Sequence, residues 1–301
     1  MIEIKNVTKK YGSYTAIENI SFNVKEGTVY GLIGYNGAGK TTFLKTAAGV
    51  YRANGGRILF DGEEIYDNAR RKAHLFYVPD DLYFQPYASM NKMASFYNGY
   101  YPDFSFETFR QLTDVFGLDP TKSINGFSKG MQRQAELVLA MATNPVYLFL
   151  DESFDGLDPQ KRVMIKNLVV DYTRERGAHV IISSHNLHDL GDMCDRFGLI
   201  NGKKLVIDHD MKDIGEDFAK YRLAFAEGDE RPDSAFSDIV TNKITRDGRL
   251  ITLIVKGDCE ATERKIKDLN PVYLEKLPLN MEEIFMEEVE GVDYDFSQIF
   301  K

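Results

Sequence analysis

The stretch TVYGLIGYNGAGKTTFLKTAAG, residues 28–49, combines a run of β-branched and aromatic residues, a glycine-rich turn and a helical pattern that ends at Gly49. These three parts predict a strand, a loop and a helix in that order. The loop matches G-x-x-x-x-G-K-[ST], in which backbone N–H groups and a helix N-terminus surround phosphate oxygens. A chance glycine-rich turn is the alternative, and the flanking strand and helix argue against it. The stretch therefore predicts an α/β fold that binds a nucleotide.

The polar residues of this loop have expected roles in holding ATP and Mg²⁺. Lys40 is expected to neutralise the β- and γ-phosphates, and the Thr41 hydroxyl is expected to ligate Mg²⁺. Thr42 is expected to cap the helix and to reach an α-phosphate oxygen. The full set of predicted phosphate-binding residues is Gly34, Asn36, Gly37, Ala38, Gly39, Lys40, Thr41 and Thr42.

A second strand, in VYLFLDES at residues 146–153, ends in the carboxylates Asp151 and Glu152. Its five uninterrupted apolar residues predict a strand buried on both faces of a parallel sheet, and such strands present ligands at their carboxyl ends. Asp151 is expected to hold Mg²⁺ and Glu152 to polarise the attacking water as general base. An acidic pair at a strand end is also typical of a solvated turn, so the pair alone leaves both interpretations open.

The stretch HVIISSHNLHDL, residues 179–190, repeats the pattern of an apolar strand followed by a polar residue, here His185, that opens a helix. We expect His185 to lie at the same sheet edge and to contact the γ-phosphate. Two alternatives remain: a helix-opening histidine without a role, and a metal site built from His185, His188 and Asp189. The phosphate interpretation is favoured because no further ligand is nearby in the sequence.

The stretch INGFSKGMQRQAELVLAMATNP, residues 124–145, predicts a helix led by Ser128 and ended by Asn144-Pro145. Here the sequence resembles the ATP-binding-cassette (ABC) ATPases, because FSKGM stands where that family has its LSGGQ signature. Ser128 and Gly130 match the signature, whereas Lys129 and its neighbours Phe127 and Met131 depart from it. The residues expected on the buried face of the helix are Met131, Ala135, Val138, Leu139 and Ala142.

Further motifs follow the family's order along about the first 210 residues. Tyr11 resembles the aromatic residue that stacks on adenine, although an ordinary aromatic at a strand end fits it as well. Asp151 and Glu152 match the family's acidic pair, Asp158 in FDGLDP its D-loop, and His185 its switch histidine. The resemblance implies a P-loop NTPase of the ABC ATPase fold, with a RecA-like core, an antiparallel β subdomain and a helical signature subdomain.

In this family two such domains face head to tail, and each ATP lies between the P-loop of one and the signature of the other. Ser128, Gly130 and the helix N-terminus behind them are therefore expected to face the ATP of a second subunit. That subunit is a second copy or another ABC ATPase, so a homodimer and a heterodimer both remain open. The expected cofactors are ATP and Mg²⁺.

One departure from the family concerns Asp80 in HLFYVPDD, residues 74–81. The family pattern after this strand is typically VPQ, and its glutamine touches Mg²⁺ and the attacking water. The Asp80 carboxylate is a hard oxygen ligand that can still bind Mg²⁺, but it adds negative charge near the γ-phosphate and donates no hydrogen bond. Gln85 is an alternative source of the amide, although the fit to VPQ favours position 80.

The domain organisation is expected to be an ABC nucleotide-binding domain over residues 1–210 and a small α+β accessory domain over residues 211–301. Within the first domain, the stretch at about 83–145 is expected to form a helical subdomain rich in aromatic residues. Those aromatics predict either a packed core or an exposed surface for a partner's helix. Residues 280–291, NMEEIFMEEVEG, resemble the terminal helix of exporter-type members.

Composition narrows the class of protein. The net charge is −9, and from residue 201 onward there are 15 Lys and Arg against 23 Asp and Glu, so the acidity lies mainly in the last third. No basic cluster suits nucleic acid as a main partner. No apolar run approaches a membrane span, and no leader is evident, so the chain itself is expected to stay in the cytoplasm. Cys194 and Cys259 lack CxxC spacing, which makes a disulfide framework or zinc site improbable.

These features together predict an ATPase subunit of an ABC transporter, held at the cytoplasmic face of the membrane by separately encoded transmembrane permease subunits. Export is the expected direction of transport. The alternative is a soluble ABC ATPase that acts on nucleic acid or the ribosome, but such members usually carry two cassettes or a long coiled-coil insertion. A degenerate cassette that uses ATP as a structural switch is a third interpretation, which Asp80 keeps open and Glu152 and His185 disfavour.

Overall fold

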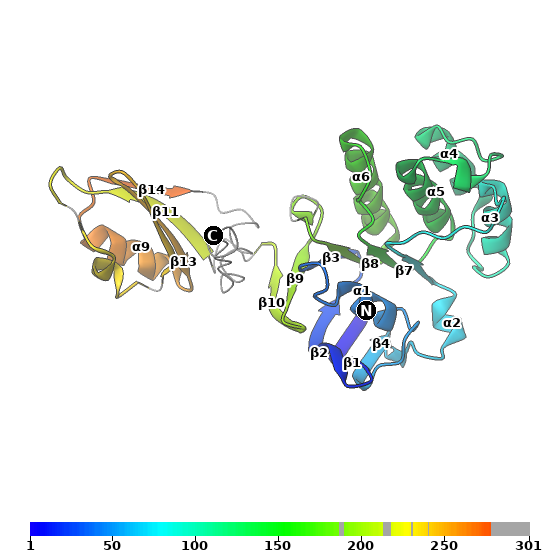
Figure 1. The fold of residues 1–301 in the computed structure, drawn as a ribbon, viewed down its shortest axis with the longest axis horizontal. Coiled ribbons are helices and arrows are strands. Elements are labelled where there is room, and N and C mark those ends of the chain that lie inside the picture. Colours follow the sequence, from blue (N-terminus) through cyan, green and yellow to red (C-terminus); the bar gives the residue numbers. More distant parts are fainter. Residues whose placement is uncertain (187–189, 213–217, 230, 240, 278–301) are drawn as a thin grey trace, which may run out of the picture. The chain divides into compact units, whose positions relative to one another are not determined.

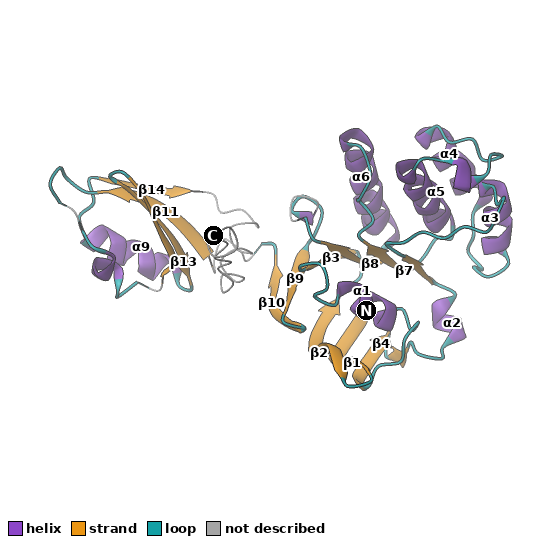
Figure 2. Ribbon diagram, in the orientation of Figure 1, coloured by secondary structure: helices purple, strands orange, loops and turns teal. Residues whose placement is uncertain are grey.

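The computed structural model describes residues 1–186, 190–212, 218–229, 231–239 and 241–277. The chain divides into two compact units, Met1–Asp208 and His209–Lys301. Figure 1 labels the helices and strands along the chain, and Figure 2 separates the helices from the strands by colour. The first unit holds every residue that the sequence predicts for nucleotide binding.

The first unit begins with a four-stranded sheet in the order β2-β1-β4-β5, with antiparallel pairing throughout. Alternate apolar residues of β1 and β2 point into the core, as expected for a sheet with one face buried. Gly55 pairs with Thr8 of β1 and so begins β4. The strands are β1 (Ile2–Tyr11), β2 (Tyr14–Val24), β4 (Gly55–Phe60) and β5 (Glu63–Glu64).

A six-stranded sheet in the order β10-β9-β3-β8-β7-β6 forms the centre of this unit. The pairs β6–β7, β7–β8, β3–β8 and β3–β9 are parallel, and every residue of β7 and β8 is buried. The predicted strand buried on both faces is thus confirmed. The strands are β3 (Thr28–Ile33), β6 (Leu75–Val78), β7 (Tyr147–Asp151), β8 (His179–Ser184), β9 (Arg196–Asn201) and β10 (Lys204–Asp210).

Parallel pairing brings the carboxyl ends of β3, β6, β7 and β8 to one sheet edge. Ile33 pairs with Ser184, Asp151 with Ser183, and Val78 with Leu150. The loop after β3, the Asp80 segment, the acidic pair and His185 therefore leave the sheet at the same edge. This register gathers residues that lie far apart in the sequence.

Helix α1 (Lys40–Ala47) connects the two sheets, since it contacts β1 and β2 of one and β7 of the other. Phe43 and Leu44 are fully buried in a core that draws on both sheets. Helix α6 (Pro159–Arg176) contacts β3, and the short helix α2 (Ala69–Lys72) contacts β6. The glycine-rich loop is thus anchored at both ends, by a central strand and by a buried helix.

The stretch at about 83–145 contains α3 (Met90–Asn98), α4 (Phe106–Phe116), the 3-10 turn η1 (Ile124–Gly126) and α5 (Lys129–Ala142). Figure 1 shows α3, α4 and α5 gathered together. The expectation of a single buried face on α5 is wrong, because every residue from Arg133 to Ala142 is buried. The reason is that α3, α4 and β6 all pack against α5.

Some aromatic residues of this helical region are buried and others are exposed. Phe84 and Phe109 are buried, as a packed core requires. Tyr83, Tyr87 and Tyr100 are exposed by 82%, 83% and 67%, so they contribute little to that core. The packed-core interpretation therefore holds for the buried members, and a surface for a partner's helix stays a prediction for the exposed ones.

The second unit contains a four-stranded antiparallel sheet in the order β12-β13-β11-β14, with α9 against β13. Its elements are β11 (Phe218–Ala224), η2 (Asp233–Phe236), β12 (Thr241–Asp247), β13 (Leu250–Lys256), α9 (Cys259–Asp268) and β14 (Tyr273–Leu277). Tyr221, Leu223 and Leu253 are fully buried in a separate core. The segment 280–291, predicted as a terminal helix, lies outside the described residues.

Two further expectations concern composition. Cys194 and Cys259, for which a disulfide framework or a zinc site is improbable from the sequence, both have buried side chains. Among the helices described, none has the length and apolar character required to span a bilayer.

Candidate nucleotide-binding site

The loop after β3 has the backbone shape that phosphate binding requires. Gly37 and Gly39 adopt φ values of 84° and 111°, which side chains rarely allow. A Cβ on Gly34 would lie 2.7 Å from the Ile200 carbonyl oxygen, and one on Gly39 would lie 2.6 Å from Ile17. Other residues would therefore distort the loop, which supports the sequence argument for glycine at these positions.

Helix α1 starts directly at Lys40, with Gly39 as its N-cap and no side chain capping it. The expectation that Thr42 caps the helix is wrong, because Thr42 already lies within the first turn. Thr41 and Thr42 are both partly exposed there. The uncapped first turn leaves backbone N–H groups at a positive dipole end, which is the arrangement that attracts anions.

Lys40 and Glu152 form a buried ion pair at the centre of the site. Lys40 Nζ lies 3.0 Å from Glu152 Oε1, and the two side chains are only 4% and 8% exposed. The same Nζ donates to the carbonyl oxygens of Gly34, at 2.6 Å, and Tyr35, at 3.2 Å. Lys40 is thus held over the loop that is expected to surround the phosphates.

His185 contacts the other oxygen of the Glu152 carboxylate. Its Nδ1 lies 2.8 Å from Glu152 Oε2, and its backbone N–H donates to the same oxygen at 3.2 Å. Glu152 has a φ of 46°, an uncommon conformation for a residue with a side chain. The structure therefore brings together Glu152, His185 and Lys40, three residues that the sequence assigns to catalysis or phosphate binding.

Asp151 is fully buried at the end of β7, and both of its carboxylate oxygens accept hydrogen bonds. Ser183 Oγ donates to Oδ1 at 2.6 Å, and the Tyr77 hydroxyl donates to Oδ2 at 2.9 Å. Among the described residues, no Lys or Arg forms an ion pair with Asp151. A buried carboxylate without an ion-paired cation fits a site for a hard divalent ion such as Mg²⁺.

A second group of metal-capable side chains lies beside it. Ligand atoms of Glu152, Asp155 and His185 all fall within 4.8 Å of one another. His188 and Asp189, named in the alternative metal site, lie outside the described residues. The sequence did not identify Asp155 as a candidate ligand. Only its distance from the Glu152 carboxylate distinguishes it from other acidic residues in loops, and that distance is known only from the structure.

Asp80 lies just beyond β6, and its side chain is 51% exposed. Burial is the main factor that raises the pKa of its carboxyl; Arg133 opposes this, and Asp151, Asp81 and Glu152 add to it. Asp80 therefore lies within the electrostatic reach of the acidic pair. Its position is compatible with the predicted metal role, although the described metal-capable group does not include it.

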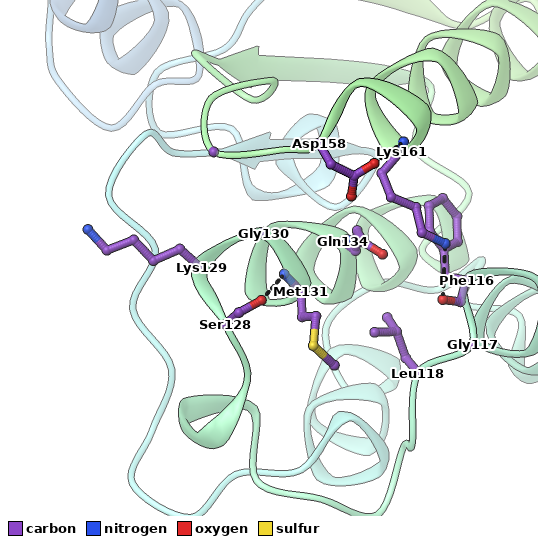
Figure 3. A pocket seen from close by; sticks show the side chains of 11 residues that line it. Phe116, Gly117, Leu118, Ser128, Lys129, Gly130, Met131, Gln134, Asp158 and Lys161 are labelled. Atoms are coloured by element: carbon purple, nitrogen blue, oxygen red, sulfur yellow. Dashed lines mark hydrogen bonds between the residues drawn. The ribbon is translucent and has the colours of Figure 1, made fainter.

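The signature segment contributes to a separate hollow of about 590 Å³. Ser128 caps α5 by accepting a hydrogen bond from the Met131 N–H, and Ser128 and Lys129 are exposed. Figure 3 shows Lys129 extending away from the other residues that line the hollow. The lining residues, none of which belongs to the loop 34–42, are Phe116, Gly117, Leu118, Ser128, Lys129, Gly130, Met131, Gln134, Gly156, Asp158 and Lys161.

Asp158 and Tyr11 complete the set of predicted residues. Asp158 caps α6 by accepting from the Lys161 N–H at 2.9 Å, and it lines the same hollow as Ser128. Tyr11 is 44% exposed at the end of β1, and its ring meets the Tyr51 ring edge-on at 5.9 Å. Lys9 Nζ lies over the same ring, 5.3 Å from its centroid. The Tyr11 ring therefore has two neighbours within the chain, and its stacking on adenine stays a prediction.

Three supporting residues were not identified from the sequence. Tyr77 and Ser183 hold Asp151, and Arg133 contacts the Asp80 segment. Ser183 could have been found from the sequence, since it lies next to the end of a predicted strand, as the acidic pair does. Tyr77 and Arg133 gave no such signal, because their roles depend on strand register and on the packing of α5.

A glycine loop between a parallel strand and a helix, with Lys40 and two strand-end carboxylates, defines the class of P-loop nucleotide-binding proteins. The sequence pattern of the family described as ABC transporter matches residues 17–155. The chain is 29% identical over 291 residues to the ABC transporter ATP-binding protein YtrB of Bacillus subtilis, covering 97% of this chain and 99% of that protein.

The chain is also 32% identical to YhcH of B. subtilis, named as an uncharacterized ABC transporter ATP-binding protein, with 71% of each chain covered. A dimeric ATP-binding cassette, MJ0796, solved in a post-hydrolysis state with ADP and Pi, matches with a TM-score of 0.62. That match has 21% identity and covers 70% of this chain and 99% of the other, so it establishes the fold. The protein belongs to the ATP-binding subunits of ABC transporters, and it is an ATPase.

Proposed function

We propose that this subunit binds ATP with Mg²⁺, pairs with a second ATP-binding subunit around the nucleotide, and drives separately encoded membrane subunits, most simply in export. The observation that carries the hydrolytic part is the contact of Lys40, Glu152 and His185 at one sheet edge. In this proposal Lys40 neutralises phosphate charge, Glu152 accepts a proton from the attacking water, and His185 orients Glu152.

The metal part of the proposal assigns Mg²⁺ to Thr41, Asp151 and Asp80. Support comes from the buried Asp151 carboxylate, which has hydrogen-bond donors but no ion-paired cation among the described residues. Bound Mg²⁺ would supply positive charge to the phosphate oxygens. Tyr77 and Ser183 would keep Asp151 in a fixed orientation for that ion.

The pairing part rests on the signature segment. Ser128 and Gly130 line a hollow that includes no residue of the loop 34–42, and Ser128 is exposed at a helix N-terminus. An exposed group of donors beside a positive dipole end suits the phosphates of a nucleotide held by another subunit. A homodimer and a heterodimer are both compatible with this surface.

Export is proposed from the names of relatives. The chain is 30% identical to the lantibiotic transport protein SrtF of Streptococcus pyogenes and 31% identical to the linearmycin resistance protein LnrL of B. subtilis. A methionine import protein, MetN of Clostridium tetani, is 30% identical. Membrane subunits would hold the chain at the cytoplasmic face of the membrane, and no basic cluster favours nucleic acid as the partner.

The Glu152→Gln variant tests the proposed function. The amide cannot accept the proton from water, so hydrolysis should fall by about 10²–10⁴-fold while ATP binding remains. Light scattering should show a dimer with MgATP and a monomer without it. Wild-type turnover by this variant, together with a monomer at saturating MgATP, would refute the proposal.

A further inference from the structure

Arg133 is a buried cation outside the set of residues discussed for the reaction. It lies in α5, five residues after Ser128, and its side chain is only 7% exposed. Buried guanidinium groups are costly unless their donors are hydrogen-bonded and their charge is compensated. The hydrogen bonds and the ion pair of Arg133 therefore indicate the role of this buried guanidinium group.

Both terminal nitrogens of Arg133 bind the Asp80 segment. Nη1 donates to the Pro79 carbonyl oxygen and Nη2 to the Asp80 carbonyl oxygen, each at 2.6 Å. These short, charge-assisted bonds fix two consecutive carbonyl groups with one planar side chain. The chain between β6 and α3 is thus tied to α5.

The Arg133 charge also faces the Asp80 side chain. Nη2 lies 3.6 Å from Asp80 Oδ1. Three further carboxylates, those of Asp151, Asp81 and Glu152, lie within electrostatic reach of Asp80. Arg133 thus places positive charge against a carboxylate that has other carboxylates near it.

We propose that Arg133 is a positioning residue that neutralises Asp80 at the phosphate site and ties the Asp80 segment to the helix that carries Ser128 and Gly130. Five residues of helix separate Arg133 from Ser128, about 7.5 Å along the axis. A displacement of Asp80 by the nucleotide would therefore be passed to the signature segment through a rigid helix. The inference rests on the proposed function, because it assigns a regulatory link within that same site.

The two roles of Arg133 can be separated by substitution in the Glu152→Gln background, which prevents turnover. Arg133→Met removes both the charge and the two carbonyl contacts. Arg133→Lys keeps the charge but cannot make the same paired bonds. Asp80→Asn removes the carboxylate charge that Arg133 is proposed to neutralise. The two readouts are MgATP affinity by calorimetry and ATP-dependent dimerisation by light scattering.

Arg133→Met should weaken MgATP binding about tenfold, ~1.4 kcal/mol, when Asp80 is present, but less than about twofold in the Asp80→Asn background. An equal loss in both backgrounds would overturn the neutralising role. Dimerisation should remain impaired in Arg133→Met with Asp80→Asn, because the carbonyl contacts are still absent. Full recovery of dimerisation would overturn the positioning role.

Arg133→Lys keeps the proposal testable if Arg133→Met does not fold, as judged by circular dichroism and thermal unfolding. The Lys variant should bind MgATP nearly as well as its parent yet dimerise more weakly, and normal dimerisation would contradict the link to α5. Failure of the proposed function would look different. In that case the Glu152→Gln parent, with Arg133 and Asp80 intact, would itself show no ATP-dependent dimer.

Discussion

The loop around Lys40 and the signature segment around Ser128 differ in how completely this chain satisfies them. Lys40 is 4% exposed and has an ion-pair partner and two carbonyl contacts within the chain. Ser128 and Lys129 are exposed, and no carboxylate among the described residues pairs with Lys129. One half of the site is therefore formed by its own fold, whereas the other half presents donors to solvent, as a surface that binds another subunit's nucleotide would.

The largest effect is expected from Lys40→Met, which removes the buried cation of the self-contained half. MgATP affinity should fall by at least about 100-fold, since a charge-assisted contact to phosphate is lost and Glu152 is left without its ion partner. Lys45→Met, in the last turn of the same helix, is the matched control. Calorimetry that finds equal affinity for the two variants would remove Lys40 from the phosphate site.

Ser128→Glu is expected to have the next largest effect, on the exposed half alone. Negative charge at the N-terminus of α5 should repel a phosphate and reduce turnover about 100-fold. ATP binding by the isolated chain should remain within about twofold, because the hollow at Ser128 excludes the loop 34–42. Ser95→Glu, exposed on α3, provides the control. A loss of monomer affinity in Ser128→Glu would mean that one chain supplies both halves.

Asp80→Gln should have a smaller effect on the self-contained half. The amide removes negative charge near the phosphates and can donate a hydrogen bond. ATP binding should be retained, and steady-state hydrolysis should be equal to the wild-type rate or a few-fold higher. Complete loss of turnover in a variant with a normal unfolding temperature would show that the carboxylate itself is required.

Glu136→Gln has the smallest expected effect on the nucleotide-binding site, and it tests the stability of α5, the helix that Ser128 caps. Glu136 lies in α5, its Oε1 accepts from Tyr97, and its Oε2 has no hydrogen-bond partner among the described residues. Burial raises the pKa of Glu136 from 4.5 to about 7, with Tyr97 and Arg133 opposing the shift. Since the folded protein holds this proton more tightly than the unfolded chain, ionisation of Glu136 lowers stability as pH rises from 4.5 to 7.

The Gln variant should therefore be more stable than the wild type by about 3 kcal/mol at pH 8, with most of the difference lost as the pH falls to 4.5. Denaturant unfolding at both pH values measures this. A difference that is constant across the range would mean that Glu136 keeps an ordinary pKa.

The two halves also differ in how far the sequence predicts them. The strand, glycine loop and helix at residues 28–49 follow from local pattern alone, and the structure has all three. The acidic pair can also be predicted from the sequence, because the apolar run of a buried strand ends at Asp151 and Glu152. Thr42 as a helix cap was wrong because the helix begins at Lys40, and its N-cap is Gly39, three residues before Thr42.

Contacts between helices and strands could not be predicted from the sequence in the same way. Arg133 was overlooked because a helical pattern indicates which residues are apolar, and it does not show that α3, α4 and β6 all pack against α5. Tyr77 reaches Asp151 only through the register of β6 and β7. The role of a residue such as Tyr77 can be identified only when the pairing of the strands is known.

The central claim, that the exposed half of one chain completes the self-contained half of another, is tested most directly by mixing two inactive variants. Lys40→Met retains Ser128, and Ser128→Glu retains Lys40, so a mixed dimer contains one complete site. The account predicts that the mixture hydrolyses ATP well above the rate of either variant alone. A mixture no more active than the two separate variants would contradict it.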